Sequence, residues 1–90
     1  MAGRKYYLTV IRSRNHAVKL HYVLDILDSN KFHLVSTPCE IQAGCSYSIK
    51  FYNLNDLSII ENEAKELSIE IFGTFSFERK EGKNIIKRIN

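Results

Sequence analysis

Both cysteines of the chain, Cys39 and Cys45, lie in one short stretch, TPCEIQAGCSY, at residues 37–47. Two thiols in such a loop could form a disulfide, contribute to a metal site, act as a redox switch or carry sulfur. Gly44 allows the backbone beside Cys45 to approach another group closely or to adopt a positive φ. Pro38 stiffens the start of the loop. The choice between these uses depends on what surrounds the thiols.

Basic residues and the start of a helix are expected beside this loop. The connection between an expected strand and an expected helix contains the basic residues Arg12, Arg14 and His16, and also Ser13. The first turn of a helix has unpaired N–H groups and a partial positive charge. Such surroundings lower the pKa of a thiol and would equally stabilise a persulfide or selenide anion. We therefore expect Cys45 to have a pKa below the ~8.5 of a free cysteine, with Cys39 as a second thiol.

The hydrophobic pattern predicts the elements that position these residues. Strands are expected at 5–12, 32–37, 46–52 and 69–79, and helices at 16–27 and 57–67. The order βαββαβ predicts an α+β ferredoxin-like sandwich, with two helices on one face of a four-stranded antiparallel sheet. Right-handed crossovers then place the 12–16 connection at the same edge of the sheet as the 38–45 loop.

A length of 90 residues indicates one domain, which we assign to residues 1–79, followed by a basic tail at 80–90. Residues 1–77 have eight Lys or Arg and eight Asp or Glu, whereas residues 78–90 have five and two. We expect the tail to be dispensable for stability, with Ile85, Ile86 and Ile89 on one helical turn. Because the body is neutral, we do not expect nucleic acid to be the partner.

Other chemistry finds little support in the residue pattern. The chain has no phosphate-binding glycine loop, and two cysteines alone do not give the ligand set of a structural zinc site. We therefore expect no cofactor and no metal. A Cys45–His16 nucleophile pair lacks an orienting acid, so a turnover enzyme is not expected. No apolar run is long enough for a membrane span, and no signal peptide is recognisable, so we expect a cytoplasmic protein with reduced thiols.

The pattern LTVIRSRNHAVKLHYVL … HLVSTPCEIQAGCSYSIKF … IEIFGTF resembles the selenium/sulfur carrier-like family of small bacterial proteins. Members of that family are sometimes fused to a sulfur-transfer domain of the TusA type. Cys45 matches the family's loop cysteine and Pro38 its preceding proline, whereas Cys39 replaces a residue that is often basic and Ser46 one that is often Gly. The resemblance implies a carrier without a cofactor, in which a partner protein loads or removes sulfur or selenium at Cys45.

Two other functions remain open from the residues alone. The protein could be a non-catalytic binding module whose cysteines are spectators, or a small redox or metal-binding protein that uses both cysteines. Thiol reactivity at neutral pH distinguishes the first of these from a carrier, and metal content after purification distinguishes the second. An open sheet also has two exposed edge strands, which allow a homodimer through strand pairing.

Overall fold

The computed structural model describes residues 5–41 and 46–90. The chain begins with strand β1 (Lys5–Ile11), helix α1 (Arg14–Leu27), strand β2 (His33–Ser36) and strand β3 (Tyr47–Phe51). A short 3-10 helix, η1 (Leu54–Asp56), leads into helix α2 (Leu57–Glu66), and strands β4 (Gly73–Lys80) and β5 (Lys83–Arg88) follow. The predicted α+β class is confirmed.

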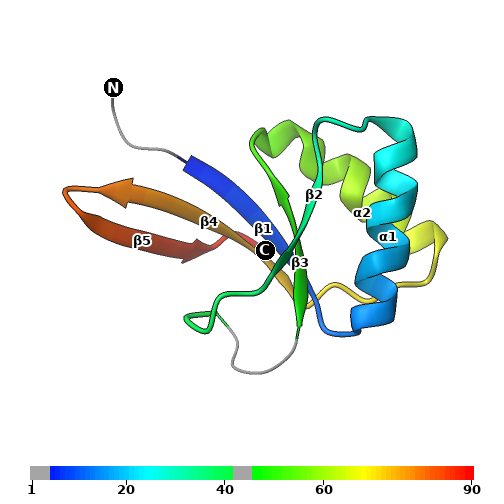
Figure 1. The fold of residues 1–90 in the computed structure, drawn as a ribbon, viewed down its shortest axis with the longest axis horizontal. Helices are drawn as coiled ribbons and strands as arrows, with labels where there is room; N and C mark the ends of the chain where they lie inside the picture. The colour runs from blue at the N-terminus through cyan, green and yellow to red at the C-terminus, as the bar shows by residue number, and fades with distance from the viewer. Residues whose placement is uncertain (1–4, 42–45) are drawn as a thin grey trace.

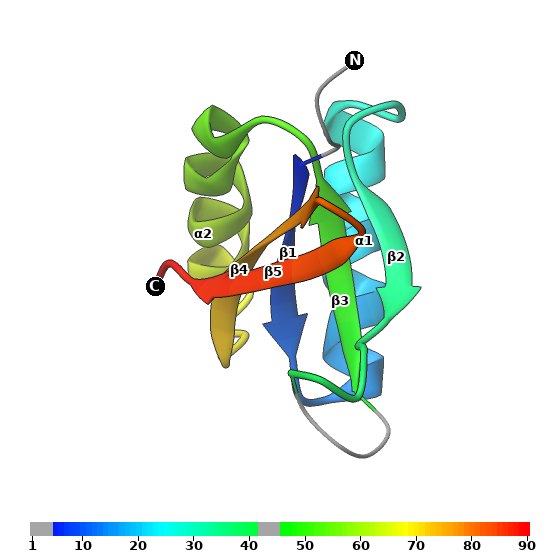
Figure 2. The ribbon, with the colours of Figure 1, turned by 90° about the vertical axis from the view of Figure 1, so that its left-hand side faces the viewer.

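The strands form one sheet in the order β2-β3-β1-β4-β5, and every neighbouring pair is antiparallel. Both helices cover the same face of this sheet, with α1 on the side of β2 and β3 and α2 on the other side (Figures 1 and 2). The sheet therefore has five strands instead of the expected four. β1 lies at its centre, with β3 on one side and β4 on the other.

The two helices bury the residues that their spacing predicts. In α1 the buried side chains are Ala17, Leu20 and Leu24, and in α2 they are Ile60 and Ala64. Leu27, which the same stripe includes, is 57% exposed because α1 ends at this residue. The helical period therefore predicts the face that packs on the sheet, except at the last residue of α1.

The sheet is apolar on both faces. On the helix face, Tyr7 and Ile11 of β1 pack with Ile49 and Phe51 of β3 and with both helices. A second cluster lies on the opposite face. It consists of Leu8, Val10, Phe75 and Phe77, with Tyr6, Val35, Ile41, Phe72 and Ile86 partly buried against it. Side chains alternate between the two faces of a strand, so β1 contributes to both clusters, as its sequence predicts.

Residues 69–72, expected as the start of the last strand, instead form an irregular return segment. Ser68 has a φ of 56°, which ends α2 in the left-handed region, and the N–H of Ile69 donates to the carbonyl of Ala64 at 2.8 Å. A reversal of this kind satisfies the last carbonyls of a helix. Ile69 is buried in the helix-side core, so its apolar character reflects packing beneath α2 and not strand alternation.

The expectation of a basic tail with one helical turn is wrong for most of residues 80–90. Residues 83–88 form β5, which pairs with β4 so that Ile86 lies opposite Phe77. Between the strands, Glu81 and Gly82 have φ values of 53° and 75°. Two consecutive residues with positive φ are typical of a type I′ hairpin turn. The hairpin extends beyond the body of the protein, and β5 returns toward it (Figure 1).

The position of β5 gives a prediction about stability. Replacing half-buried Ile86 by Ala should lower the free energy of unfolding by about 1–2 kcal/mol, because it removes methyl groups that pack on the second cluster. The matched control is Lys87→Ala, at an exposed position of the same strand, which should change stability by less than ~0.5 kcal/mol. Urea unfolding measures both. Equal midpoints for wild type and Ile86→Ala would mean that β5 is a dispensable tail.

Candidate functional site

The segments that contain the sequence-predicted site residues begin or end at one end of the sheet, which we call the cysteine edge. β1 ends there at Ile11, β3 begins there at Tyr47, and these two residues pair directly. β2 ends there as well, since Ser36 pairs with Tyr47. β4 starts there, with Gly73 opposite Val10. The 12–16 connection and the cysteine loop therefore leave the sheet at the same edge, as the strand order predicted.

The base of the cysteine loop is closed by hydrogen bonds. The N–H of Thr37 donates to the carbonyl of Ser46 at 3.1 Å. The hydroxyls of Thr37 and Ser48 lie 2.7 Å apart, and both residues are buried. These contacts hold the residue before Pro38 and the residue after Cys45 against each other. The loop therefore leaves the sheet from two fixed ends.

The first half of the loop is a turn that folds onto the non-helix face. The N–H of Ile41 donates to the carbonyl of Pro38 at 3.0 Å, and the Ile41 side chain packs against the second cluster. Cys39 is exposed as a free cysteine on this turn. The turn therefore holds the backbone at Cys39 close to the sheet and leaves its thiol at the surface.

Cys45 and Gly44 lie outside the described residues, so the expected position of the Cys45 thiol is a proposal. The residue that follows, Ser46, is buried, with 5% of its surface exposed. Its Oγ has no hydrogen-bond partner among the described residues. A buried hydroxyl without a partner is costly, and this one lies directly beside the undescribed segment.

The start of α1 supplies the helix end that the sequence analysis placed here. Ser13 is the N-cap, and its Oγ accepts a hydrogen bond from the N–H of His16 at 3.3 Å. The guanidinium group of Arg14 lies 5.5 Å from the centre of the Tyr47 ring. Tyr47 is two residues after Cys45, so Arg14 is placed close to the end of the loop. His16 is exposed on the first turn.

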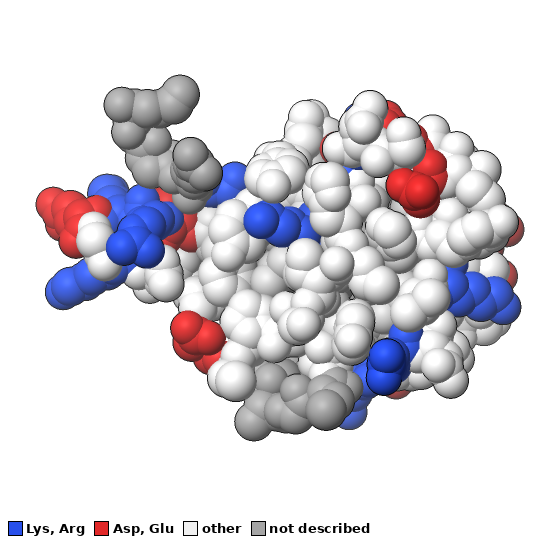
Figure 3. Space-filling view, in the orientation of Figure 1, with Lys and Arg blue, Asp and Glu red and all other residues white. Residues whose placement is uncertain are grey.

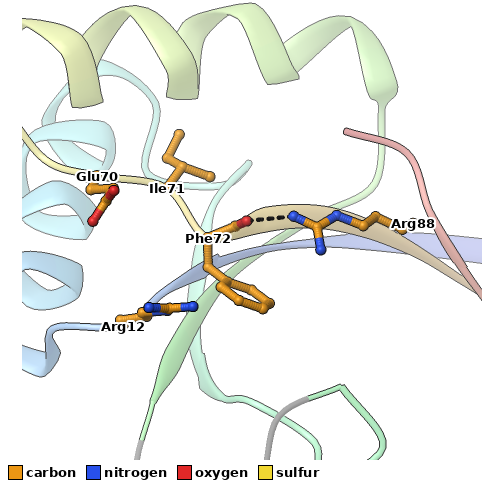
Figure 4. A pocket seen from close by; sticks show the side chains of 5 residues that line it. All are labelled: Arg12, Glu70, Ile71, Phe72 and Arg88. Atoms are coloured by element: carbon orange, nitrogen blue, oxygen red, sulfur yellow. Dashed lines mark hydrogen bonds between the residues drawn. The ribbon is translucent and has the colours of Figure 1, made fainter.

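Arg12, unlike Arg14, does not contact Tyr47 but lies on the other face of the sheet. Its guanidinium group is 4.6 Å from the centre of the Phe72 ring, and Phe72 belongs to the second cluster on the non-helix face. Arg88 at the end of β5 approaches the same ring at 5.1 Å, and its Nη2 donates to the Phe72 carbonyl at 2.8 Å. Figure 4 shows the Phe72 ring between the two arginines. Arg12 and Arg14, grouped together by the sequence, therefore contact different aromatic rings.

The two arginines line a shallow pocket of about 240 Å³ together with Glu70, Ile71 and Phe72. Arg88 is held further by a hydrogen bond from its Nε to the Asn90 carbonyl at 3.3 Å. A guanidinium group on an aromatic face gains roughly 0.5–2 kcal/mol. The pocket is therefore a positively charged depression next to the cysteine edge.

Sequence reasoning missed Phe72 and Arg88 as members of this region. Arg88 was assigned to a basic tail outside the sheet, whereas β5 runs back along β4 and brings it to Phe72. A local signal was present: Gly82 lies between two segments that could pair as strands, and Gly is favoured where a two-residue hairpin turn needs a positive φ. The high charge of the segment concealed this signal.

Within residues 5–41 and 46–90, no group of three or more His, Cys, Asp or Glu side chains is arranged to bind a metal. In the same part of the chain, no helix combines the length and the apolar character needed to cross a membrane.

The hydroxyl pair at the base of the loop gives a second prediction. Thr37→Val should lower the free energy of unfolding by ~1–3 kcal/mol, because the buried Ser48 Oγ then loses its partner. Ser48→Ala should lower the free energy of unfolding by a similar amount. The double variant should lower it by clearly less than the sum of the two single losses. Urea unfolding of the three variants completes the cycle. Additive losses would mean that the two hydroxyls do not stabilise each other.

A scan against protein families matches residues 6–76 to the family described as putative Se/S carrier protein-like. Searches of curated proteins and of solved structures each found no match. The match covers β1, both helices, the cysteine loop and the start of β4. Since it spans well over half of the chain, the protein belongs to the putative Se/S carrier protein-like family.

Proposed function

We propose that the protein carries reactive sulfur or selenium on Cys45, which a transfer protein loads and an acceptor removes. The observation that supports this most is the closed base of the cysteine loop beside the start of α1. Thr37 and Ser46 fix the loop end next to Cys45, and Arg14 lies over Tyr47 close by. An anion held there would face a guanidinium group and the positive end of a helix, both of which stabilise negative charge.

The proposed transfer needs no external oxidant or reductant. The Cys45 thiolate attacks the outer sulfur of a donor persulfide, and a sulfur–sulfur bond forms at Cys45. The donor's own sulfur–sulfur bond breaks, and the donor leaves as a thiolate with the bonding electron pair. A donor with selenium as the outer atom reacts in the same way. An acceptor nucleophile then attacks the outer atom, and Cys45 leaves as a thiolate.

Cys39 is the second thiol in this proposal. It is exposed on the turn closed by the hydrogen bond between Ile41 and Pro38. Its thiolate can attack the inner sulfur of a Cys45 persulfide, which forms a Cys39–Cys45 disulfide and releases hydrosulfide. The proposed location is the cytoplasm, where thiol reductants would return this disulfide to two thiols before the next transfer.

Intact mass after incubation with a persulfide donor tests the assignment of the two thiols. We expect Cys39→Ser to gain one sulfur atom that dithiothreitol removes, and Cys45→Ser to gain none. Wild type should show the same gain, followed by the loss of two hydrogens relative to the reduced protein as Cys39 displaces hydrosulfide and the disulfide forms. Iodoacetamide reaction over a range of pH should also show a lower pKa for Cys45 than for a free cysteine. Loading on Cys39 alone would reverse the assignment. No loading on either residue would favour a binding module with spectator cysteines.

A further prediction separates the two arginines. Arg14→Gln should raise the pKa of Cys45 by a few tenths of a unit at low salt, because an exposed charge acts weakly through water. Arg12→Gln is the matched control and should have a smaller effect, since Arg12 lies on Phe72. Both variants should stay within about 1 kcal/mol of wild-type stability. The same pKa shift in both variants, or none in Arg14→Gln, would contradict the proposed position of the thiol near Tyr47.

A further inference from the structure

Two arginines from distant parts of the chain meet at the pocket beside the cysteine edge. Arg12 follows β1 and Arg88 ends β5, and their guanidinium groups lie 4.6 and 5.1 Å from the centre of the Phe72 ring. Together with Glu70 and Ile71 they line the pocket of about 240 Å³. The transfer proposed for the cysteine loop uses none of these residues, so the pocket calls for a function of its own.

The backbone holds the guanidinium group of Arg88 in one orientation. Its Nη2 donates to the Phe72 carbonyl at 2.8 Å, and its Nε donates to the Asn90 carbonyl at 3.3 Å. Gly73 makes this position possible, because a Cβ there would lie only 2.9 Å from Nη2. A guanidinium group has five N–H donors in a rigid plane. Since these two carbonyls occupy only some of them, Arg88 presents its other donors to a ligand from a fixed position.

The positive charge of the two arginines is not neutralised by acidic side chains of the described residues. In the part of the chain that the structure describes, both ion pairs involve Lys31, so Glu70 pairs with neither arginine. Figure 4 shows Glu70 on the side of the pocket away from Arg88. The β4–β5 hairpin differs, because basic and acidic side chains adjoin there (Figure 3). The pocket therefore has an excess of positive charge.

We propose that this pocket binds a tetrahedral oxyanion of the phosphate type, either as the free ion or as the phosphate group of a larger molecule. Hydrogen bonds between arginine and phosphate are charge-assisted and frequently bidentate. The two guanidinium groups reach the ligand from different directions, because the Phe72 ring lies between them (Figure 4). A carboxylate has two oxygens in one plane and matches one guanidinium group, whereas a tetrahedral anion has further oxygens for the second.

The two arginines have different parts in this site. Arg88 provides the fixed contact, since its guanidinium group is held by two carbonyls. Arg12 is exposed, so its side chain can turn toward the same ligand from the other side of the ring. Glu70 has the same sign of charge as the ligand and opposes its binding. The pocket includes neither cysteine, so this site can be present or absent independently of sulfur loading.

Titration of the full chain with inorganic phosphate at constant ionic strength tests the proposal, with NMR shifts of the backbone amides as the readout. We expect saturable shifts around Phe72. Arg12→Gln and Arg88→Gln should each raise the dissociation constant by at least about threefold, because each removes a charge close to the anion. Glu70→Gln should lower the dissociation constant. Arg79→Gln is the matched control, since it removes the same charge from the hairpin, and it should bind phosphate like wild type.

Two further variants separate the orientation of Arg88 from its charge. Arg88→Lys keeps the charge but loses the planar fork, so it should also weaken phosphate binding. Gly73→Ala should do the same by displacing the guanidinium group while both charges remain. The dispersion of the amide spectrum shows whether each variant is folded. Should Gly73→Ala fail to fold, Arg88→Lys provides the comparison at unchanged charge.

Two other ligands test the proposed chemical class. Acetate, a carboxylate, should bind at least about threefold more weakly than inorganic phosphate. Glycerol phosphate that competes with inorganic phosphate would identify the phosphate group of a larger molecule as the ligand, and glycerol phosphate that does not compete would identify the free ion. The absence of saturable shifts with both phosphates overturns the proposal. Equal affinity for acetate, or the same loss of affinity in Arg79→Gln as in Arg88→Gln, overturns it as well.

Discussion

The central strand β1 is the constraint on which the rest of the structure depends. It is paired with β3 on one side and with β4 on the other, and its side chains are buried on both faces of the sheet. Even its one buried polar residue on the helix face, Thr9, is satisfied through a hydroxyl contact of 2.9 Å with Thr74. A strand held in this way cannot shift its register by one residue without exchanging the two apolar clusters. Every element that begins or ends beside β1 is consequently fixed in position.

The cysteine edge follows directly from this constraint. Because β1 ends at Ile11 opposite the first residue of β3, the start of α1 and the base of the cysteine loop lie at the same end of the sheet. The described residues at the two ends of the loop, Thr37 and Ser46, are joined by a hydrogen bond, and Ile41 packs on the non-helix face. The site is thus built from rigid elements around a short connection. Such an arrangement suits the proposed role, in which one reactive group is presented to successive partners.

The second apolar cluster explains why β5 belongs to the fold. Phe75 and Phe77 of β4 face away from the helices, and without β5 these rings would have less apolar cover. β5 covers them with Ile86 and also returns Arg88 to Phe72. The β4–β5 hairpin therefore both covers the second cluster and places Arg88 beside Phe72. The basic character of the C-terminal segment is structural at Arg88 and protective at the edge of the sheet.

The sequence by itself determined the features that depend on local periodicity. The stripe of Ala17, Leu20 and Leu24, the alternation in β1 and β3, and the shared edge of loop and helix could all be predicted, because each follows from side-chain direction or from chain connectivity. The resemblance to the carrier family also came from the sequence, and the family match confirmed it.

Only the tertiary structure decided where the charges lie and how many strands the sheet has. Residues 83–88 became a strand because β4 offered them an edge and an apolar face, and neither is visible in their own composition. Arg12 and Arg14 separated because one follows β1 and contacts a ring on the non-helix face, whereas the other begins α1. These features depend on contacts between residues far apart in the chain, and a local sequence pattern does not encode such contacts.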